Sequence, residues 1–201
     1  MKHKTLLALS AAAIFGSGAI YAQESNLSYN YIGAEYFEGD LLDDDFSGYG
    51  AEISLSLSDS IFFTGTAAKA EQDNRRVFQQ WTGTPEVRNY SAGLGFHTPL
   101  SNNADIYVAA KYVKSDLKFG GRSVEADGIG ADVGIRALLS PALELEGVVK
   151  YIGGDDFEED FGYRANLRFY ISPAFSLSAG YFDGDRGDAA DGFVAGIRFN
   201  F

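Results

Sequence analysis

Histidines and carboxylates are the side chains through which this chain could carry out acid–base chemistry. Histidine titrates near neutral pH, and the sequence contains two, His3 and His97. General acid–base catalysis requires a second group at hydrogen-bonding distance, and no residue close to His97 in the sequence is a convincing partner. We therefore expect His97 to be a polar interior or turn residue, and we predict a protein that is not an enzyme and uses no cofactor.

Acidic residues gather in a few polar stretches, where their carboxylates could bind hard divalent cations. The alternative is that these stretches are simply solvated and keep the surface soluble. The candidate cation-binding residues are Asp43, Asp44, Asp45, Asp155, Asp156, Asp183, Asp185 and Asp188. The chain has a formal net charge of −12 and no cysteine. This excludes nucleic acid as a partner, because phosphate binding requires a basic surface, and it also excludes disulfides and thiolate metal sites.

The first 22 residues differ in kind from the rest. A short basic start, MKHK, is followed by an apolar run and then by small residues, which is typical of a secretory signal peptide. The apolar run is too short to cross a bilayer comfortably as a helix. We predict a signal peptide at residues 1–22 and a single domain at residues 23–201.

Apolar and polar residues alternate along most of that domain, which is typical of β-strands. The clearest example is residues 49–58, YGAEISLSLS. Stretches of this kind predict ten strands that start near residues 27, 47, 61, 88, 105, 128, 143, 161, 175 and 192. Each is about nine to eleven residues long, which is the length that a tilted strand needs to cross a membrane.

Two kinds of connection alternate between the predicted strands. Short turns are expected at residues 57–61, 97–105, 139–143 and 171–175, and longer polar loops at 38–47, 71–87, 115–127, 153–160 and 183–191. In lipid a sheet leaves no unpaired edges and must close. We predict an all-β fold, a closed antiparallel up-and-down transmembrane barrel of about ten strands. The alternatives are a barrel of eight strands and a soluble sandwich or lipocalin-like barrel.

The apolar face of the strands favours the membrane barrel, because its residue types change with height. Its middle is aliphatic and its two ends are aromatic, as bilayer interfaces prefer. The aromatic residues toward the long loops are Tyr49, Tyr90, Tyr112, Tyr151, Tyr163, Tyr181 and Phe193. Those toward the short turns are Phe62, Phe96, Phe169, Phe175, Phe199 and Phe201.

The other face carries small residues and charges of both signs, and it predicts an interior braced by ion pairs. The expected members of this network are Glu52, Lys69, Lys111, Asp132, Arg136, Glu146, Lys150, Arg164, Arg168 and Arg198. If residues 139–143 form a tight turn, Arg136 lies opposite Glu146 and Asp132 opposite Lys150. The next pairing is expected to put Arg168 opposite Glu146, and Arg164 beside Lys150.

The chain resembles the bacterial outer-membrane β-barrel proteins over its whole length after the signal peptide. The final residues, FVAGIRFNF, resemble the C-terminal signal that the barrel assembly machinery reads, with Phe193, Ile197, Phe199 and Phe201 at alternating positions. The stretch LSYNYIGAEY and the repeated LSP turns resemble those of a poorly characterised family of small outer-membrane barrels.

This resemblance implies a location in the outer membrane with both termini in the periplasm. The implied partners are outer-membrane lipid, lipopolysaccharide, the assembly machinery and export chaperones, for a monomeric protein. Enzymes of this class work at the extracellular rim, whereas His97 lies beside a short turn. We expect a mostly filled, ion-paired lumen, acidic extracellular loops and a structural or surface-interaction role. The alternative is a narrow porin-like channel for small solutes.

Overall fold

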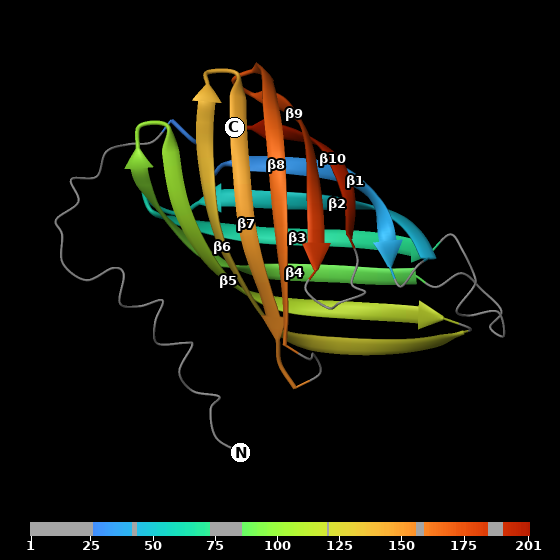
Figure 1. Ribbon diagram of the computed structural model, residues 1–201. Coiled ribbons are helices and arrows are strands. Elements are labelled where there is room, and N and C mark those ends of the chain that lie inside the picture. The colour runs from blue at the N-terminus through green and yellow to red at the C-terminus, as the bar shows by residue number, and fades with distance from the viewer. Residues whose placement is uncertain (1–25, 42–43, 73–85, 120, 156–158, 185–190) are drawn as a thin grey trace.

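The chain folds into ten antiparallel strands that close into one barrel (Figure 1). The computed structural model describes residues 26–41, 44–72, 86–119, 121–155, 159–184 and 191–201, so the predicted signal peptide lies outside the described residues. The strands are β1 (Tyr31–Leu41), β2 (Asp44–Ser56), β3 (Ile61–Gln72), β4 (Glu86–Ser101), β5 (Ala104–Phe119), β6 (Arg122–Ser140), β7 (Leu143–Gly153), β8 (Asp160–Ser172), β9 (Phe175–Gly184) and β10 (Asp191–Asn200).

Each strand pairs with its neighbours in sequence, and β1 pairs with β10 to close the sheet. The closing register runs from Tyr31 opposite Asn200 to Asp40 opposite Asp191. The predicted closed, up-and-down barrel of ten strands is therefore confirmed. Within the described part of the chain, no helix is long and apolar enough to cross a membrane.

The two ends of the barrel differ in their connections. At one end, which we call the short-turn end, four connections of two to four residues join β2 to β3, β4 to β5, β6 to β7 and β8 to β9. The remaining connections lie at the opposite end, which we call the loop end. The N–H of Asn26 donates to the carbonyl of Asn102 in the β4–β5 turn, and the N–H of Phe201 donates to the carbonyl of Asn30. Both ends of the described chain therefore lie at the short-turn end.

Several strands are longer than the predicted nine to eleven residues. β4 and β5 have 16 residues each and β6 has 19. At about 3.3 Å per residue, strands of this length extend beyond a hydrocarbon core about 30 Å thick even when tilted. The polar stretches 38–47 and 115–127 were predicted as loops, but most of their residues belong to strands. Gly121, at φ 77°, allows β5 to turn tightly into β6.

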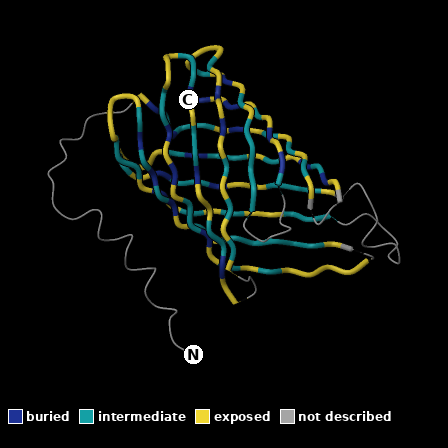
Figure 2. The backbone as a smooth tube through the Cα atoms, in the orientation of Figure 1, coloured by how far each residue is buried: buried dark blue, intermediate teal, exposed yellow. Residues whose placement is uncertain are grey.

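Exposure alternates along the strands because successive side chains point to opposite faces of the barrel wall (Figure 2). The outward face is apolar, and the predicted outward aromatic residues lie on it at both ends, with one exception. The most exposed aromatic residues are Tyr36, Tyr49, Tyr112, Tyr163, Phe169, Phe193 and Phe201. An apolar outer wall between two rows of aromatic rings matches a lipid environment.

The exception is β3, whose predicted orientation is wrong. Phe62 is only 5% exposed and lies inside the barrel, where it contacts Tyr29 and Tyr107. A shift of one residue exchanges the two faces of a strand, so Lys69 lies on the outer face, opposite the exposed Tyr49. Phe62 and Phe63 are adjacent aromatic residues, so the alternating pattern fits equally well with either of them on the outer face.

Candidate functional site: the barrel interior

Residues 26–30 cross the mouth of the barrel at the short-turn end. Asn26 is hydrogen-bonded to the β4–β5 turn, whereas Asn30 accepts a hydrogen bond from the N–H of Ser56 on β2. Because three strands separate β1 from β5 in the wall, this segment passes over the lumen. The first strand, predicted to start near residue 27, therefore starts only at Tyr31. Leu27 and Tyr29 are both buried.

Four aromatic rings fill the lumen beneath this crossing segment, and we call them the aromatic plug: Tyr29, Phe62, His97 and Tyr107. Tyr29 stacks on His97 at a centroid distance of 3.9 Å, and it lies 4.8 Å from Phe62. Tyr107 lies across Gly134, where a Cβ would come within 2.6 Å of its ring. A glycine at that position is therefore what lets the Tyr107 ring lie across the lumen.

Beside the aromatic plug lies the most deeply buried ion pair of the described residues, with the Arg136 guanidinium 4.8 Å from the centre of the Tyr29 ring. Arg136 is 2% exposed and Glu144 is not exposed at all. Two guanidinium nitrogens of Arg136 donate to the two carboxylate oxygens of Glu144, at 2.8 and 3.2 Å. Arg136 also donates to the carbonyl of Ser28 at 2.9 Å, and the hydroxyl of Tyr170 donates to Glu144. The pair thus ties the wall to the crossing segment.

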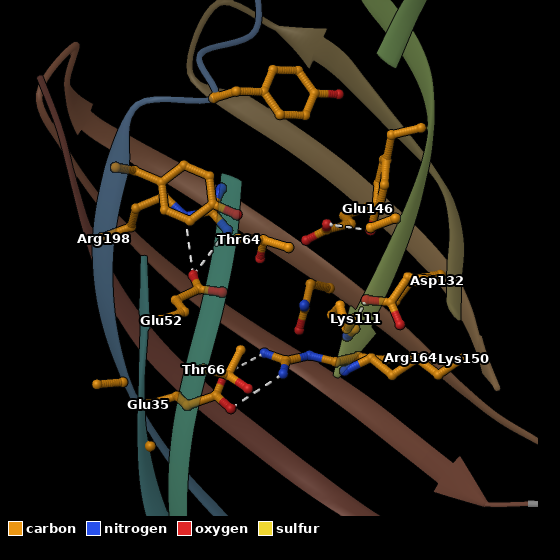
Figure 3. Close-up of a pocket in the computed structure, with 18 of the residues that line it drawn as sticks. Glu35, Glu52, Thr64, Thr66, Lys111, Asp132, Glu146, Lys150, Arg164 and Arg198 are labelled. Atoms are coloured by element: carbon orange, nitrogen blue, oxygen red, sulfur yellow. Dashed lines mark hydrogen bonds and ion pairs between the residues drawn. The ribbon is translucent and has the colours of Figure 1, made fainter. Parts of the chain in front are cut away.

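Three further ion pairs span the middle of the lumen (Figure 3). Arg198 Nη2 lies 3.0 Å from Glu52 Oε1, Arg164 Nη2 lies 2.6 Å from Glu35 Oε2, and Lys111 Nζ lies 2.6 Å from Asp132 Oδ2. These pairs join β10 to β2, β8 to β1 and β5 to β6. The pairs Arg198–Glu52 and Arg164–Glu35 therefore link strands that are not neighbours in the wall.

The predicted register is correct for one hairpin and wrong for the next. Arg136 lies opposite Glu146, and Asp132 lies opposite Lys150, as expected. The ion pairs differ, however, because Arg136 binds Glu144 and Asp132 binds Lys111.

Between β7 and β8 the pairing is offset by two residues from the prediction. Glu144, and not Glu146, lies opposite Arg168, and Lys150 lies opposite Gly162. In the observed register Lys150 does not lie opposite Arg164. The predicted register would have placed these two like charges directly opposite each other, which is destabilising. Arg168 is buried, and its Nη1 lies 3.4 Å from the Ser176 hydroxyl.

Nine of the ten predicted interior charges thus lie inside the barrel. The alternation of inward and outward residues along the strands could have identified three more charged residues on the inward face. Asp105 and Glu144 share the inward face with predicted members of their strands, and Glu35 lies on the inward face of β1, from which no residue was selected. Asp105 is fully buried, and its Oδ2 lies 3.3 Å from Nδ1 of His97. A carboxylate on the neighbouring strand β5 therefore lies close to His97, although Nδ1 makes no hydrogen bond with any described residue.

Three cavities that are lined by described residues lie at different heights of the barrel. The cavity at the short-turn end has a volume of about 530 Å³, the middle cavity about 220 Å³ and the cavity at the loop end about 590 Å³. The middle and loop-end cavities share Thr66, Lys111, Asp132 and Lys150. The middle and short-turn cavities share no lining residue among those described, because the aromatic plug and the buried ion pair lie between them.

Lys69 belongs to a cluster of charges on the outer face near the loop end, and not to the lumen. Its Nζ lies 2.7 Å from Glu71 and 2.8 Å from Glu86, and Arg88 lies 2.6 Å from Glu86. Glu86 lies four residues beyond the outward Tyr90, outside the apolar band. The hydrogen bond from Lys69 lowers the pKa of the Glu86 carboxyl below its usual value.

Replacing Lys69 by methionine is expected to raise the pKa of Glu86 toward its usual value, in an NMR titration of the carboxyl carbons. In the unmodified protein, the stability that comes from the lowered pKa is present above about pH 4.3 and is lost as the pH falls through the folded pKa. Lys114→Met is the control, because Lys114 pairs with Glu125 and Asp116. An unchanged Glu86 pKa in Lys69→Met would contradict this assignment.

The predicted cation-binding carboxylates remain a prediction. Asp43, Asp156, Asp185 and Asp188 lie outside the described residues, as does the side chain of Asp44. Of the others, Asp183 accepts a hydrogen bond from Tyr163, and Asp45 and Asp155 are exposed. In the part of the chain that the structure describes, no three histidine or acidic side chains come close enough to hold one ion.

Comparison with known proteins finds similarity in structure only, since no protein-family model and no curated protein sequence matches the chain. An outer-membrane channel from Pseudomonas putida F1 aligns with a TM-score of 0.52 at 10% identity, covering 88% of this chain and 97% of that one. The KdgM porin, in complex with disordered oligogalacturonate, aligns with a TM-score of 0.50 at 10% identity, covering 84% and 99%. The chain has the fold of a bacterial outer-membrane β-barrel. The outer face of this barrel is apolar, and the charged face lines the lumen.

The last strand of the barrel has the pattern expected of an assembly signal. Phe193, Ile197, Phe199 and Phe201 all lie exposed on the outer face. Arg198 and Asn200, which alternate with them, are buried inside. The arrangement is compatible with the predicted C-terminal signal, whose reading by the assembly machinery stays a prediction.

Proposed function

We propose that the protein is an outer-membrane barrel whose lumen is closed at the short-turn end, and that its role is structural or surface-interactive. The observation that carries this proposal is the separation of the middle cavity from the short-turn cavity among the described residues. Between them, bulky rings and a fully buried ion pair replace open space. A solute that enters from the loop end would therefore meet a packed layer near the short-turn end.

The orientation proposed is loop end outward, with both termini in the periplasm. The short turns and the two ends of the described chain lie together, which supports this orientation. The longest strands, β4, β5 and β6, would then project above the membrane. Their charged outer face and the acidic loops would meet lipopolysaccharide, together with the divalent cations that bridge its phosphates. We propose a monomer without catalytic activity.

Planar-bilayer recording tests the closed lumen. The purified barrel, with insertion verified by flotation of proteoliposomes, is expected to give no steady and reproducible single-channel steps. The reason is that the aromatic plug and the Arg136–Glu144 pair fill the cross-section. Steady steps of one size from pure protein would contradict the proposal.

The second candidate function is a narrow channel for small solutes. One observation favours it: the loop-end and middle cavities share the lining residues Thr66, Lys111, Asp132 and Lys150. Two similar structures are described as a porin and a channel. Under this alternative the crossing segment would have to move, and the same recordings would show conductance.

A further inference from the structure

The outer half of the lumen has the space to hold a small molecule. Four inward positions around the middle and loop-end cavities carry no side chain or only a methyl group: Gly50, Ala68, Gly130 and Gly162. Gly162 lies directly opposite Lys150, so no side chain from β8 fills the space beside that ammonium group. Together the two cavities form a vestibule that ends at the aromatic plug.

Three cations bring unused hydrogen-bond donors to this vestibule. Lys150 lies on its wall and makes no ion pair within 4.0 Å with any described residue, and its accessible surface faces the cavity (Figure 3). Arg164 Nε and Arg198 Nη1 are buried, and neither has a hydrogen-bond partner among the described residues. Leaving charged donors unsatisfied away from bulk water is costly, so these groups favour a bound acceptor.

Most of the acceptors in the vestibule are already engaged. Both carboxylate oxygens of Glu35 receive hydrogen bonds from Arg164. Glu52 Oε1 receives two from Arg198, and Asp132 Oδ2 receives one from Lys111. Two buried acceptors of this cavity have no partner among the described residues: the amide oxygen of Asn166 and the hydroxyl of Tyr29, which can also donate. What the unpaired groups of the vestibule lack is therefore mainly hydrogen-bond acceptors.

Glu146 makes the bottom of the vestibule more negative than the region around Lys150. It lies four residues from Lys150 on the same inward face of β7, about 13 Å away along the strand. Tyr107 donates to its Oε1 at 3.0 Å, which holds this negative charge at the bottom of the cavity beside the aromatic plug. An anion is thus repelled at the bottom of the vestibule and attracted nearer its mouth.

We propose that the vestibule is a binding site for a small oxyanion, in which Lys150 is the principal ligand and Arg164 supplies a second donor. The oxyanion reaches it from the loop end. The site goes beyond the structural role proposed above and does not depend on it, because binding in the outer half is possible whether or not the inner layer opens.

Isothermal titration calorimetry on the full detergent-solubilised barrel tests the site with three probes: succinate, inorganic phosphate and the neutral analogue succinamide. Succinate is expected to bind saturably and succinamide to give no binding heat. Phosphate shows whether the site recognises oxyanions in general or carboxylates in particular. Binding of both succinate and phosphate assigns a general oxyanion site. Binding of succinate alone assigns a carboxylate site. Equal binding of succinamide, or no binding of either anion at 50 mM, the highest concentration tested, would overturn the proposal.

Substitution at Lys150 assigns the site to this residue. Lys150→Met is expected to weaken succinate binding at least roughly tenfold, as loss of a charge-assisted hydrogen bond predicts. Lys150→Arg is expected to retain most of the affinity. The matched control is Lys114→Met, which removes a lysine from the outer face. Folding of each variant is verified by its shifted mobility on unheated gels. Unchanged affinity in folded Lys150→Met would refute the assignment.

Discussion

Arg136→Met is expected to lower the free energy of unfolding of the barrel by about 3–5 kcal/mol, the usual cost of removing one partner of a buried ion pair. The substitution leaves the Glu144 carboxylate without its cation in a layer where it has no exposed surface. It also removes the hydrogen bond to Ser28, which holds the crossing segment in the lumen. Urea unfolding of the barrel in lipid vesicles measures the loss.

Two companion variants show whether this cost comes from the uncompensated charge. The double variant Arg136→Met with Glu144→Gln is expected to recover a large part of the lost stability, since a neutral pair of similar size avoids the buried charge. Lys114→Met, which breaks an exposed pair, is expected to change stability little. A double variant that is as unstable as Arg136→Met would argue against the explanation.

Deletion of Phe201 is expected to reduce the amount of folded barrel in the outer membrane of cells several-fold, while purified and refolded protein keeps nearly its full stability. In the folded barrel the Phe201 side chain is 62% exposed on the outer face, so its removal exposes no core. Its contacts there are few: its ring stacks on Phe199 at 6.4 Å. The measurement compares membrane fractions with urea unfolding of the refolded variant.

Phe175→Ala is the matched control for this deletion. Phe175 is an outward aromatic residue at the same end of the barrel, and it lies opposite Phe199 in the wall. It does not belong to the chain terminus, so its loss is expected to leave insertion in cells nearly normal. Normal insertion of the chain without Phe201 would instead mean that the terminal residue is not part of an assembly signal.

The strand pattern could be predicted from the sequence because a barrel wall imposes the same period on every strand. Residues such as Tyr49 and Arg136 therefore fall on the correct faces without any knowledge of their neighbours. β3 is the exception, since Phe62 and Phe63 satisfy the aromatic pattern equally well in either orientation. The error at β3 also placed Lys69 in the lumen.

The partners of the interior charges could not be predicted in the same way. Arg164 reaches Glu35 across the lumen, between strands that do not pair, so no register argument connects them. Tyr29 reaches the interior only because residues 26–30 pass over the mouth toward the β4–β5 turn. Both contacts depend on the diameter and closure of the whole barrel, which local alternation does not encode.

The pairing of β1 with β10 also determines when the barrel can close, because it requires both ends of the chain. The first strand to be synthesised finds its second partner only when the last strand is complete, so one edge of β1 stays unpaired throughout synthesis. An unpaired edge is a template for aggregation, and a pairing between the two ends of a chain forms slowly. Such a chain must be kept from aggregating with other copies of itself until β10 is available to pair with β1.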